Sequence, residues 1–160
     1  MRILLAIDGS EQSEAAVDEV CDRHFPPDSD VRVMSVVEPI IFAGSLPGEY
    51  VNAGIYVEME KSAQERARRA VDTAVVKLRT GAGSRQFNVT TTVVSGLAKR
   101  EILDAAEKFA ADLIVVGSHG YGGLERFLLG SVSQAVALHA RCSVEIVRGR
   151  KTLPHANKKS

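Results

Sequence analysis

Five short apolar segments alternate along this chain with four segments of helical periodicity, and this alternation restricts the possible folds more than any other feature. The apolar segments are residues 3–7, 31–37, 88–94 and 113–116, followed by a strand from Val144 to Arg148. They are short and rich in β-branched residues, which is typical of strands buried on both faces. Strands separated by helices form parallel sheets with crossover connections. The sequence therefore predicts an α/β fold: a doubly wound, Rossmann-like parallel sheet of five strands flanked by four helices.

The helical segments repeat apolar residues every three or four positions, so that each has one face to bury. The first begins after Ser10 or Ser13, either of which can cap it. The second spans about residues 55–79, the third follows Gly96, and the fourth spans residues 131–140. We expect the charge-rich face of the second helix to be solvated.

The charged residues are unevenly placed along the chain. There are 20 basic and 20 acidic side chains, but five of the basic ones lie beyond residue 147 with no acidic residue among them: Arg148, Arg150, Lys151, Lys158 and Lys159. The other 15 basic and 20 acidic side chains give residues 1–147 a charge of about −5, which disfavours a nucleic-acid partner. We expect one domain over residues 1–148 and a basic, disordered tail over residues 149–160.

The cysteine pattern and the apolar runs bear on the compartment. Two isolated cysteines, Cys21 and Cys142, suit a reducing compartment better than a disulfide framework. Asp8 interrupts the first apolar run, so we expect no secretory leader. No apolar run approaches the ~20 residues that a membrane span needs. We therefore expect a cytoplasmic protein with no membrane partner, and no spacing of His, Cys and Asp suggests a metal site.

Residues 113–133 join the fourth strand, a glycine-rich loop and the start of the last helix. Glycines at 117, 120 and 130 let backbone N–H groups approach a ligand closely. Ser131 opens the helix, whose free N–H groups and dipole favour an anion at that end. Ser131 and Gln134 also fit a capping box with Ser131 as the N-cap, which is compatible with anion binding. The stretch predicts an anion site suited to the phosphates of a nucleotide.

Asp8 follows the first strand as the glycine loop follows the fourth. In doubly wound sheets, ligands bind beyond the carboxyl ends of the strands, where the winding direction switches. If the two strands are neighbours, Asp8 and the glycines flank one crevice, where the carboxylate can accept hydrogen bonds from ribose hydroxyls or a base amine. The alternative is that Asp8 only caps the turn into the first helix.

The better-known nucleotide motifs are absent, and catalytic groups are sparse. No glycine is followed by lysine, which excludes a P-loop. The first strand is not followed by Gly-x-Gly-x-x-Gly, and no serine lies in a Gly-x-Ser-x-Gly turn. His119 is a base, a phosphate contact or simply a solvent-facing loop residue. The sequence indicates a binding site more clearly than an active site.

The spacing Gly117-x2-Gly120-x9-Gly130-Ser131 resembles the Gly-x2-Gly-x9-Gly-Ser/Thr signature of the ATP-binding branch of the universal stress proteins. The likeness covers almost the whole domain, from its first strand to its last. It implies the strand order 3-2-1-4-5, which makes the first and fourth strands neighbours. It also implies a stress-response protein that binds ATP, or another adenine nucleotide, and acts as a nucleotide-dependent dimeric switch.

The same resemblance implies roles for individual residues. Asp8 would contact the adenosine part of the nucleotide with Ala6 beside it, and the backbone of Val36 would recognise adenine. The ribose and phosphates would be held by Gly117, Gly120, Gly130, Ser131, Val132 and Ser133. Mg²⁺ would be held through the phosphates rather than by a protein cage. The strand from Val144 to Arg148 would pair with its copy to form a homodimer, which also covers an open sheet edge.

Two other functions stay open at this point. A slow ATP hydrolase or phosphotransfer enzyme needs a positioned base or electrophile, for which only His119 and Arg126 are candidates. A nucleotide-independent dimeric adaptor corresponds to the branch of the family that lacks the glycines, and the complete signature argues against it. The tail beyond Arg150 has no counterpart in the family core, and residues 38–54 belong to the part that varies most.

Overall fold

The computed structural model describes residues 1–39, 53–81, 87–120 and 129–149, and the contacts given below concern these residues. Strands and helices alternate strictly along the chain. The elements are β1 (Arg2–Ala6), α1 (Glu11–Asp22), β2 (Asp30–Val37), α2 (Ala53–Gly81), β3 (Asn88–Ser95), α3 (Ala98–Phe109), β4 (Leu113–Gly117), α4 (Ser131–His139) and β5 (Ser143–Val147).

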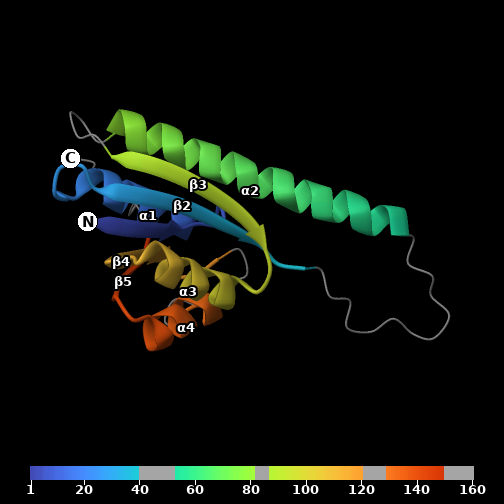
Figure 1. Cartoon of the computed structure of the whole chain (residues 1–160). Helices are drawn as coiled ribbons and strands as arrows, with labels where there is room; N and C mark the ends of the chain where they lie inside the picture. Colours follow the sequence, from blue (N-terminus) through green and yellow to red (C-terminus); the bar gives the residue numbers. More distant parts are fainter. Residues whose placement is uncertain (40–52, 82–86, 121–128, 150–160) are drawn as a thin grey trace, which may run out of the picture.

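All five strands belong to one parallel sheet with the order β3-β2-β1-β4-β5 (Figure 1). β1 lies at the centre, and its last residue, Ala6, is opposite Met34 of β2 on one side and Val116 of β4 on the other. The predicted fold class and strand order are confirmed, and β1 and β4 are neighbours. The crevice predicted between their carboxyl ends can therefore form.

Each face of the sheet is covered by a different pair of helices. α1 and α2 pack on one face through Val17, Val20, Val71 and Leu78. α3 and α4 pack on the other face through residues that include Ile102, Ala106 and Val136. Because β1 is covered on both faces, Ile3, Leu4 and Leu5 are all fully buried, and burying each such side chain contributes about 1.5–3 kcal/mol. The continuous apolar run in the sequence reflects this double coverage.

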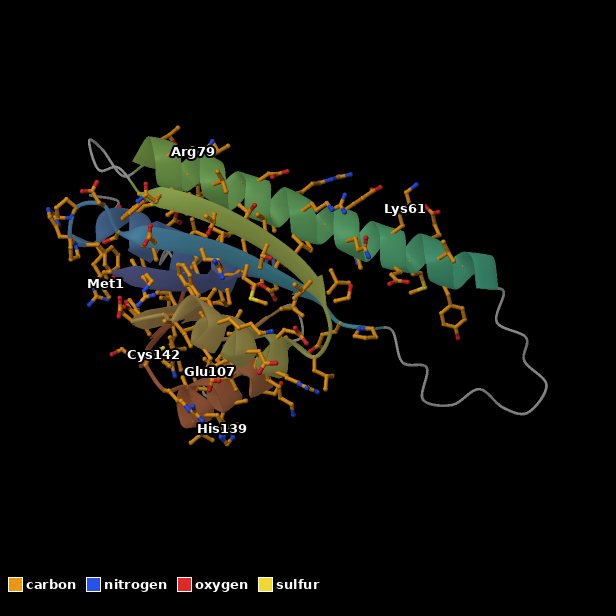
Figure 2. All side chains as sticks on the ribbon, viewed as in Figure 1. Met1, Lys61, Arg79, Glu107, His139 and Cys142 are labelled. Atoms are coloured by element: carbon orange, nitrogen blue, oxygen red, sulfur yellow. The ribbon has the colours of Figure 1, made fainter. Side chains whose placement is uncertain are left out.

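Several element boundaries differ from those expected. β5 ends at Val147, so Arg148 lies outside the strand that was predicted to run from Val144 to Arg148. α2 begins at Ala53, two residues before the expected start. Its N-terminal part, around Lys61, extends past the sheet (Figure 2), where Ile55 is 54% exposed. Within the described residues, no helix is long and apolar enough to cross a membrane.

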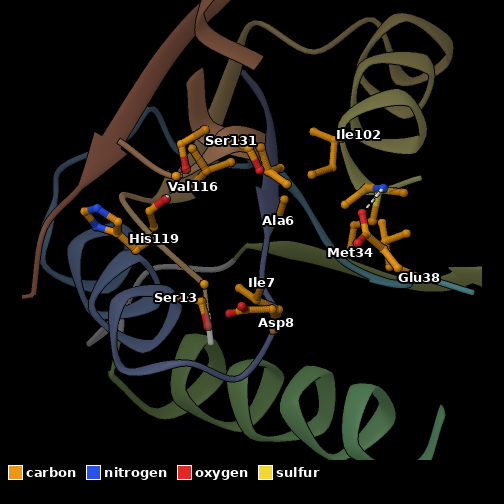
Figure 3. A pocket seen from close by; sticks show the side chains of 17 residues that line it. Ala6, Ile7, Asp8, Ser13, Met34, Glu38, Ile102, Val116, His119 and Ser131 are labelled. Atoms are coloured by element: carbon orange, nitrogen blue, oxygen red, sulfur yellow. Dashed lines mark hydrogen bonds between the residues drawn. The ribbon is translucent and has the colours of Figure 1, made fainter. Parts of the chain in front are cut away.

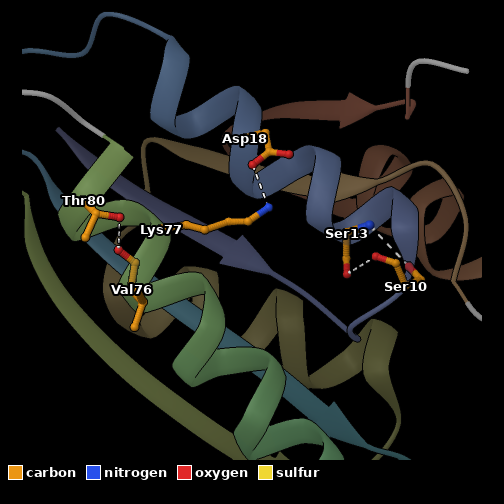
Figure 4. A network of polar contacts seen from close by, with 6 residues as sticks. All are labelled: Ser10, Ser13, Asp18, Val76, Lys77 and Thr80. Atoms are coloured by element: carbon orange, nitrogen blue, oxygen red, sulfur yellow. Dashed lines mark hydrogen bonds and ion pairs between the residues drawn. The ribbon is translucent and has the colours of Figure 1, made fainter. Parts of the chain in front are cut away.

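Polar contacts join α1 to the turn before it and to α2 (Figure 4). Ser10 is the N-cap of α1: its Oγ accepts a hydrogen bond from the backbone N–H of Ser13, and the Ser13 hydroxyl donates to the Ser10 carbonyl. The ammonium of Lys77 lies 2.9 Å from Asp18, and this hydrogen bond raises the pKa of Lys77. Of the two expected caps, Ser10 is therefore the one used.

Both cysteines are reduced in this fold. Burial raises the pKa of the Cys21 thiol, and the nearby carboxylates of Asp18 and Asp22 raise it further. Burial also raises the pKa of Cys142. Since the thiolate is the reactive form, both thiols are poor nucleophiles near neutral pH.

Candidate functional site

A cavity of about 540 Å³ opens at the carboxyl ends of β1, β2 and β4. Figure 3 shows side chains from both sides of the crevice converging on it, with Ala6 in the middle. The chain's winding changes direction between β1 and β4, because α1 covers one face and α3 the other. This is the position at which doubly wound sheets bind ligands.

All nine residues assigned to the site from the sequence line this one cavity: Ala6, Asp8, Val36, Gly117, Gly120, Gly130, Ser131, Val132 and Ser133. Further lining residues were not assigned to it: Ile7, Ser13, Met34, Glu38, Ala98, Ile102 and Val116. Met34 precedes Val36 by two positions on β2, and Ile102 follows Ala98 by one helical turn. Strand and helix periodicity would thus have placed these pairs on shared faces.

Asp8 organises the turn between β1 and α1. Its Oδ1 accepts hydrogen bonds from the backbone N–H of Ser10 at 3.0 Å and from the Ser10 hydroxyl at 2.6 Å. Gly9 has a φ of 85°, a left-handed conformation that glycine adopts without strain. The capping role expected as an alternative for Asp8 is therefore real, but it engages Oδ1. Gly120 lies against the other oxygen, since a Cβ there would be 2.5 Å from Oδ2.

Gly117 is packed against α1 on the side where a side chain would stand. A Cβ on it would lie 2.7 Å from the backbone carbon of Gln12 and 2.9 Å from the backbone nitrogen of Ser13. The carbonyl of Gly117 accepts a hydrogen bond from the hydroxyl of Ser133 at 2.7 Å. Gly117 thus brings β4, α1 and α4 close together, and this contact alone requires glycine whatever the ligand.

The N-terminus of α4 lies at one end of the cavity. Gly130, not Ser131, is its N-cap, and no side chain among the described residues caps it. The expected capping box with Ser131 as N-cap is therefore wrong. Gln134 makes the first helical hydrogen bond, to the Gly130 carbonyl. The N–H groups of Ser131, Val132 and Ser133 precede it and have no helical partner, which makes this end suited to an anion.

The opposite end of the cavity is apolar. Met34, Ile102 and Val116 are 1%, 4% and 4% exposed and line it together with Val36 and Ala98. β1 ends at Ala6, which lies opposite Met34 of β2. The last hydrogen bond between the two segments runs from the N–H of Ile7 to the carbonyl of Met34. In a strand, alternate residues direct their backbone groups to the same side. The N–H and C=O of Val36 therefore point to the side on which no strand continues.

His119 follows the fourth strand and lines the cavity, but its side chain is not solvent-facing as one interpretation had it. Its Nδ1 is 3.1 Å from the hydroxyl of Ser118, and its Nε2 is buried without a hydrogen-bond partner in the described part of the chain. In Figure 3 the ring points away from Ala6 and Ile102. Arg126, the other residue considered for catalysis, lies outside the described residues.

Strand order and winding together define a doubly wound domain of the Rossmann-like class, with a crevice at its switch point. The chain belongs to the universal stress protein family, whose model matches residues 1–148. It is 33% identical over 150 residues to universal stress protein MJ0531 of Methanocaldococcus jannaschii, covering 94% of this chain and 83% of that one. It is 31% identical over 149 residues to universal stress protein YxiE of Bacillus subtilis, covering 92% and 98%.

Solved structures share the fold at lower identity. The hypothetical protein MJ0577 superposes with a TM-score of 0.74 at 24% identity, covering 94% of this chain and 97% of that one. A family protein of Arabidopsis thaliana solved with AMP bound has a TM-score of 0.67 at 17% identity, covering 94% and 92%. A universal stress protein solved in complex with cAMP has a TM-score of 0.55 at 22% identity, covering 94% and 98%.

Proposed function

We propose that this protein binds an adenine nucleotide in the crevice between β1 and β4. The observation that carries the proposal is the division of one cavity into two chemically different ends. The α4 end offers free N–H groups without a side-chain cap, as phosphates require. The other end offers an apolar slot beside the backbone edge of Val36, which has no strand partner on that side in the described part of the chain, as a purine base requires. AMP and cAMP in two family structures of the same fold support an adenine base.

The residues take the following roles in this proposal. The backbone of Val36 pairs with the base, and Ala6 and Asp8 lie beside the adenosine part. Gly120, Gly130 and Ser131 surround the ribose and phosphates, while Val132 and Ser133 add N–H donors. Gly117 contributes mainly by allowing α1 and β4 to approach each other. The glycine-and-serine signature is complete, which favours a nucleotide-binding protein over an adaptor that works without one.

ATP with Mg²⁺ is the form that we propose the protein takes in the cell. The described residues include no group of three or more His, Cys, Asp or Glu side chains that would hold a metal, so Mg²⁺ would be carried by the phosphates. Mg²⁺ would neutralise phosphate charge there. Exchange of the nucleotide would then switch the state of a stress-response dimer.

Nucleotide binding is tested on the purified protein in two ways. We expect denaturation of the purified protein to release an adenine nucleotide, which mass spectrometry identifies. After refolding without nucleotide, we expect isothermal titration with AMP and with Mg-ATP to give dissociation constants below about 1 mM, which corresponds to about −4 kcal/mol. Absence of heat with both ligands at that concentration would remove the proposal.

We propose further that β5 forms the homodimer interface. β5 is an edge strand, and the Val147 carbonyl accepts from the N–H of Ser118 toward β4. Because backbone groups alternate between the two sides of a strand, the N–H and C=O groups of Val144 and Ile146 point away from β4. An exposed edge of this kind is a template for pairing with another chain, and a two-fold axis lets β5 pair with its own copy.

The dimer proposal predicts different effects for two substitutions at one position. Val144→Pro removes an outward N–H group and is expected to shift the protein from dimer to monomer in sedimentation equilibrium. Val144→Ala shortens the same side chain but keeps the N–H group, so it is expected to remain dimeric. If Val144→Pro forms a dimer with the same dissociation constant as the wild type, the interface lies elsewhere.

A further inference from the structure

Glu38 lies where β2 leaves the sheet and where the apolar end of the cavity begins. It follows Val37, the last residue of β2, and lines the cavity together with Met34 and Val36. Figure 3 shows Glu38 beside Met34 at this end of the cavity, and a dashed line marks the hydrogen bond that its side chain accepts. No feature of the sequence singles out this residue, because its position depends on the packing of α3 beside β2.

One oxygen of the Glu38 carboxylate is already committed. Oε1 accepts a hydrogen bond from the backbone N–H of Ala98 at 3.0 Å. Ala98 is the first residue of α3, and Leu97 before it makes no side-chain cap, so Glu38 caps this helix from another element. An ionised carboxylate accepts through both of its oxygens. Among the described residues Oε2 has no hydrogen-bond donor, so it is left as an acceptor on a residue that lines the slot for the base.

The chemistry of the base determines what this acceptor can do. Adenine has a 6-amino group with two hydrogens, whereas guanine and hypoxanthine have an acceptor oxygen at that position. If the backbone edge of Val36 reads the ring and one amino hydrogen, the second hydrogen still needs an acceptor. A carboxylate oxygen facing a 6-oxo group would place two acceptors against each other, which leaves both without a donor.

We propose that Glu38 selects adenine over 6-oxo purines by accepting the second hydrogen of the 6-amino group through Oε2. The inference rests on the proposed nucleotide function and adds the residue that sets base specificity. Carboxylates can also read the paired N–H groups of guanine, but that pairing takes both oxygens side by side. Here Oε1 already accepts from the N–H of Ala98, so the two oxygens are not equally open to the paired N–H groups of guanine, and Oε2 matches the single exocyclic amine.

AMP and IMP test this directly, because they differ only at the 6-position and the adjacent ring proton. For the wild type, we expect isothermal titration to show AMP binding at least about 10-fold more tightly than IMP. In Glu38→Gln, the amide oxygen is the only acceptor left for the Ala98 N–H, so the amide NH₂ turns toward the base. A donor now faces the 6-position. The AMP-to-IMP preference is expected to fall by about 10-fold or more, with IMP binding more tightly than in the wild type.

Two matched variants separate specificity from helix capping. Glu101→Gln changes the same chemistry in the first turn of α3, and Glu101 does not line the cavity, so its AMP-to-IMP ratio should equal that of the wild type. Glu38→Ala loses the cap together with both acceptors, so it should lower the ratio while improving IMP binding less than Glu38→Gln does. An unchanged ratio in Glu38→Gln, or equal weakening of AMP and IMP, overturns the inference while nucleotide binding stands. A wild type that binds neither ligand overturns the proposed function, and this inference with it.

Discussion

Ser131→Glu is expected to abolish nucleotide binding while leaving the fold at least as stable as the wild type. Ser131 is the first residue of α4, and it is exposed at the α4 end of the cavity. A carboxylate there interacts favourably with the helix dipole, which contributes about 0.3–1 kcal/mol to stability. The same charge about 4 Å from a phosphate costs about 4 kcal/mol at an effective dielectric constant of about 20. Allowing for screening, we expect affinity for AMP to fall at least about 100-fold.

The opposite signs of the two effects make this prediction specific. Thermal unfolding measured by circular dichroism should show an equal or higher midpoint, and titration calorimetry should show the loss of binding. Ser131→Gln has the same length without the charge and should keep binding within about 10-fold of the wild type. If Ser131→Glu binds AMP as well as Ser131→Gln does, the phosphates do not lie at the N-terminus of α4.

Gly117→Val is expected to damage the fold itself. A Cβ at this position would lie 2.7–2.9 Å from the backbone of Gln12 and Ser13, so β4 and α1 would have to separate. Overpacking of this kind typically lowers the free energy of unfolding by about 1–3 kcal/mol. Because the contacted atoms here belong to backbone, which no rotamer change can move, we expect a loss of about 3 kcal/mol. For a chain of this length, that lowers the unfolding midpoint by roughly 6–12 °C.

Gly120→Val is the matched control, because Gly120 belongs to the same signature but is exposed. A Cβ there would approach only the end of the Asp8 side chain, at 2.5 Å, and that carboxylate can rotate. We expect its unfolding midpoint to stay within about 3 °C of the wild type while its nucleotide affinity falls. Equal midpoints for Gly117→Val and the wild type would show that α1 accommodates the larger side chain.

Much of this molecule follows from local patterns in its sequence. The alternation of apolar runs and helical segments predicted the α/β class, since period and length report the type of each element. Asp8 and the glycines follow strands, and strand ends of a parallel sheet share one edge. Their convergence on one cavity therefore needed only the neighbouring positions of β1 and β4, which the resemblance to a family supplied.

The parts that the sequence left open depend on where elements end and on what packs beside them. Ser131 and Gln134 have the residue types of a capping box, but the helix begins one residue earlier than that pattern requires, with Gly130 as its N-cap. His119 belongs to a polar loop by composition, yet Nε2 is buried. Local pattern does not determine a helix start to within one residue, because several caps have similar free energies.

By itself, then, the sequence determined the fold class, the order of elements and the chemical types available at one sheet edge. Only the tertiary structure decided which hydrogen-bonding groups at that sheet edge face the cavity. Among the described residues, the backbone edge of Val36 has no strand partner on one side because β1 stops opposite Met34. Glu38 lines the same slot, and α3 begins beside it. Gly117 has no room for a side chain because α1 crosses it. Periodicity along a chain encodes which residues share a face, whereas register and packing between distant segments decide which hydrogen-bonding groups lack a partner.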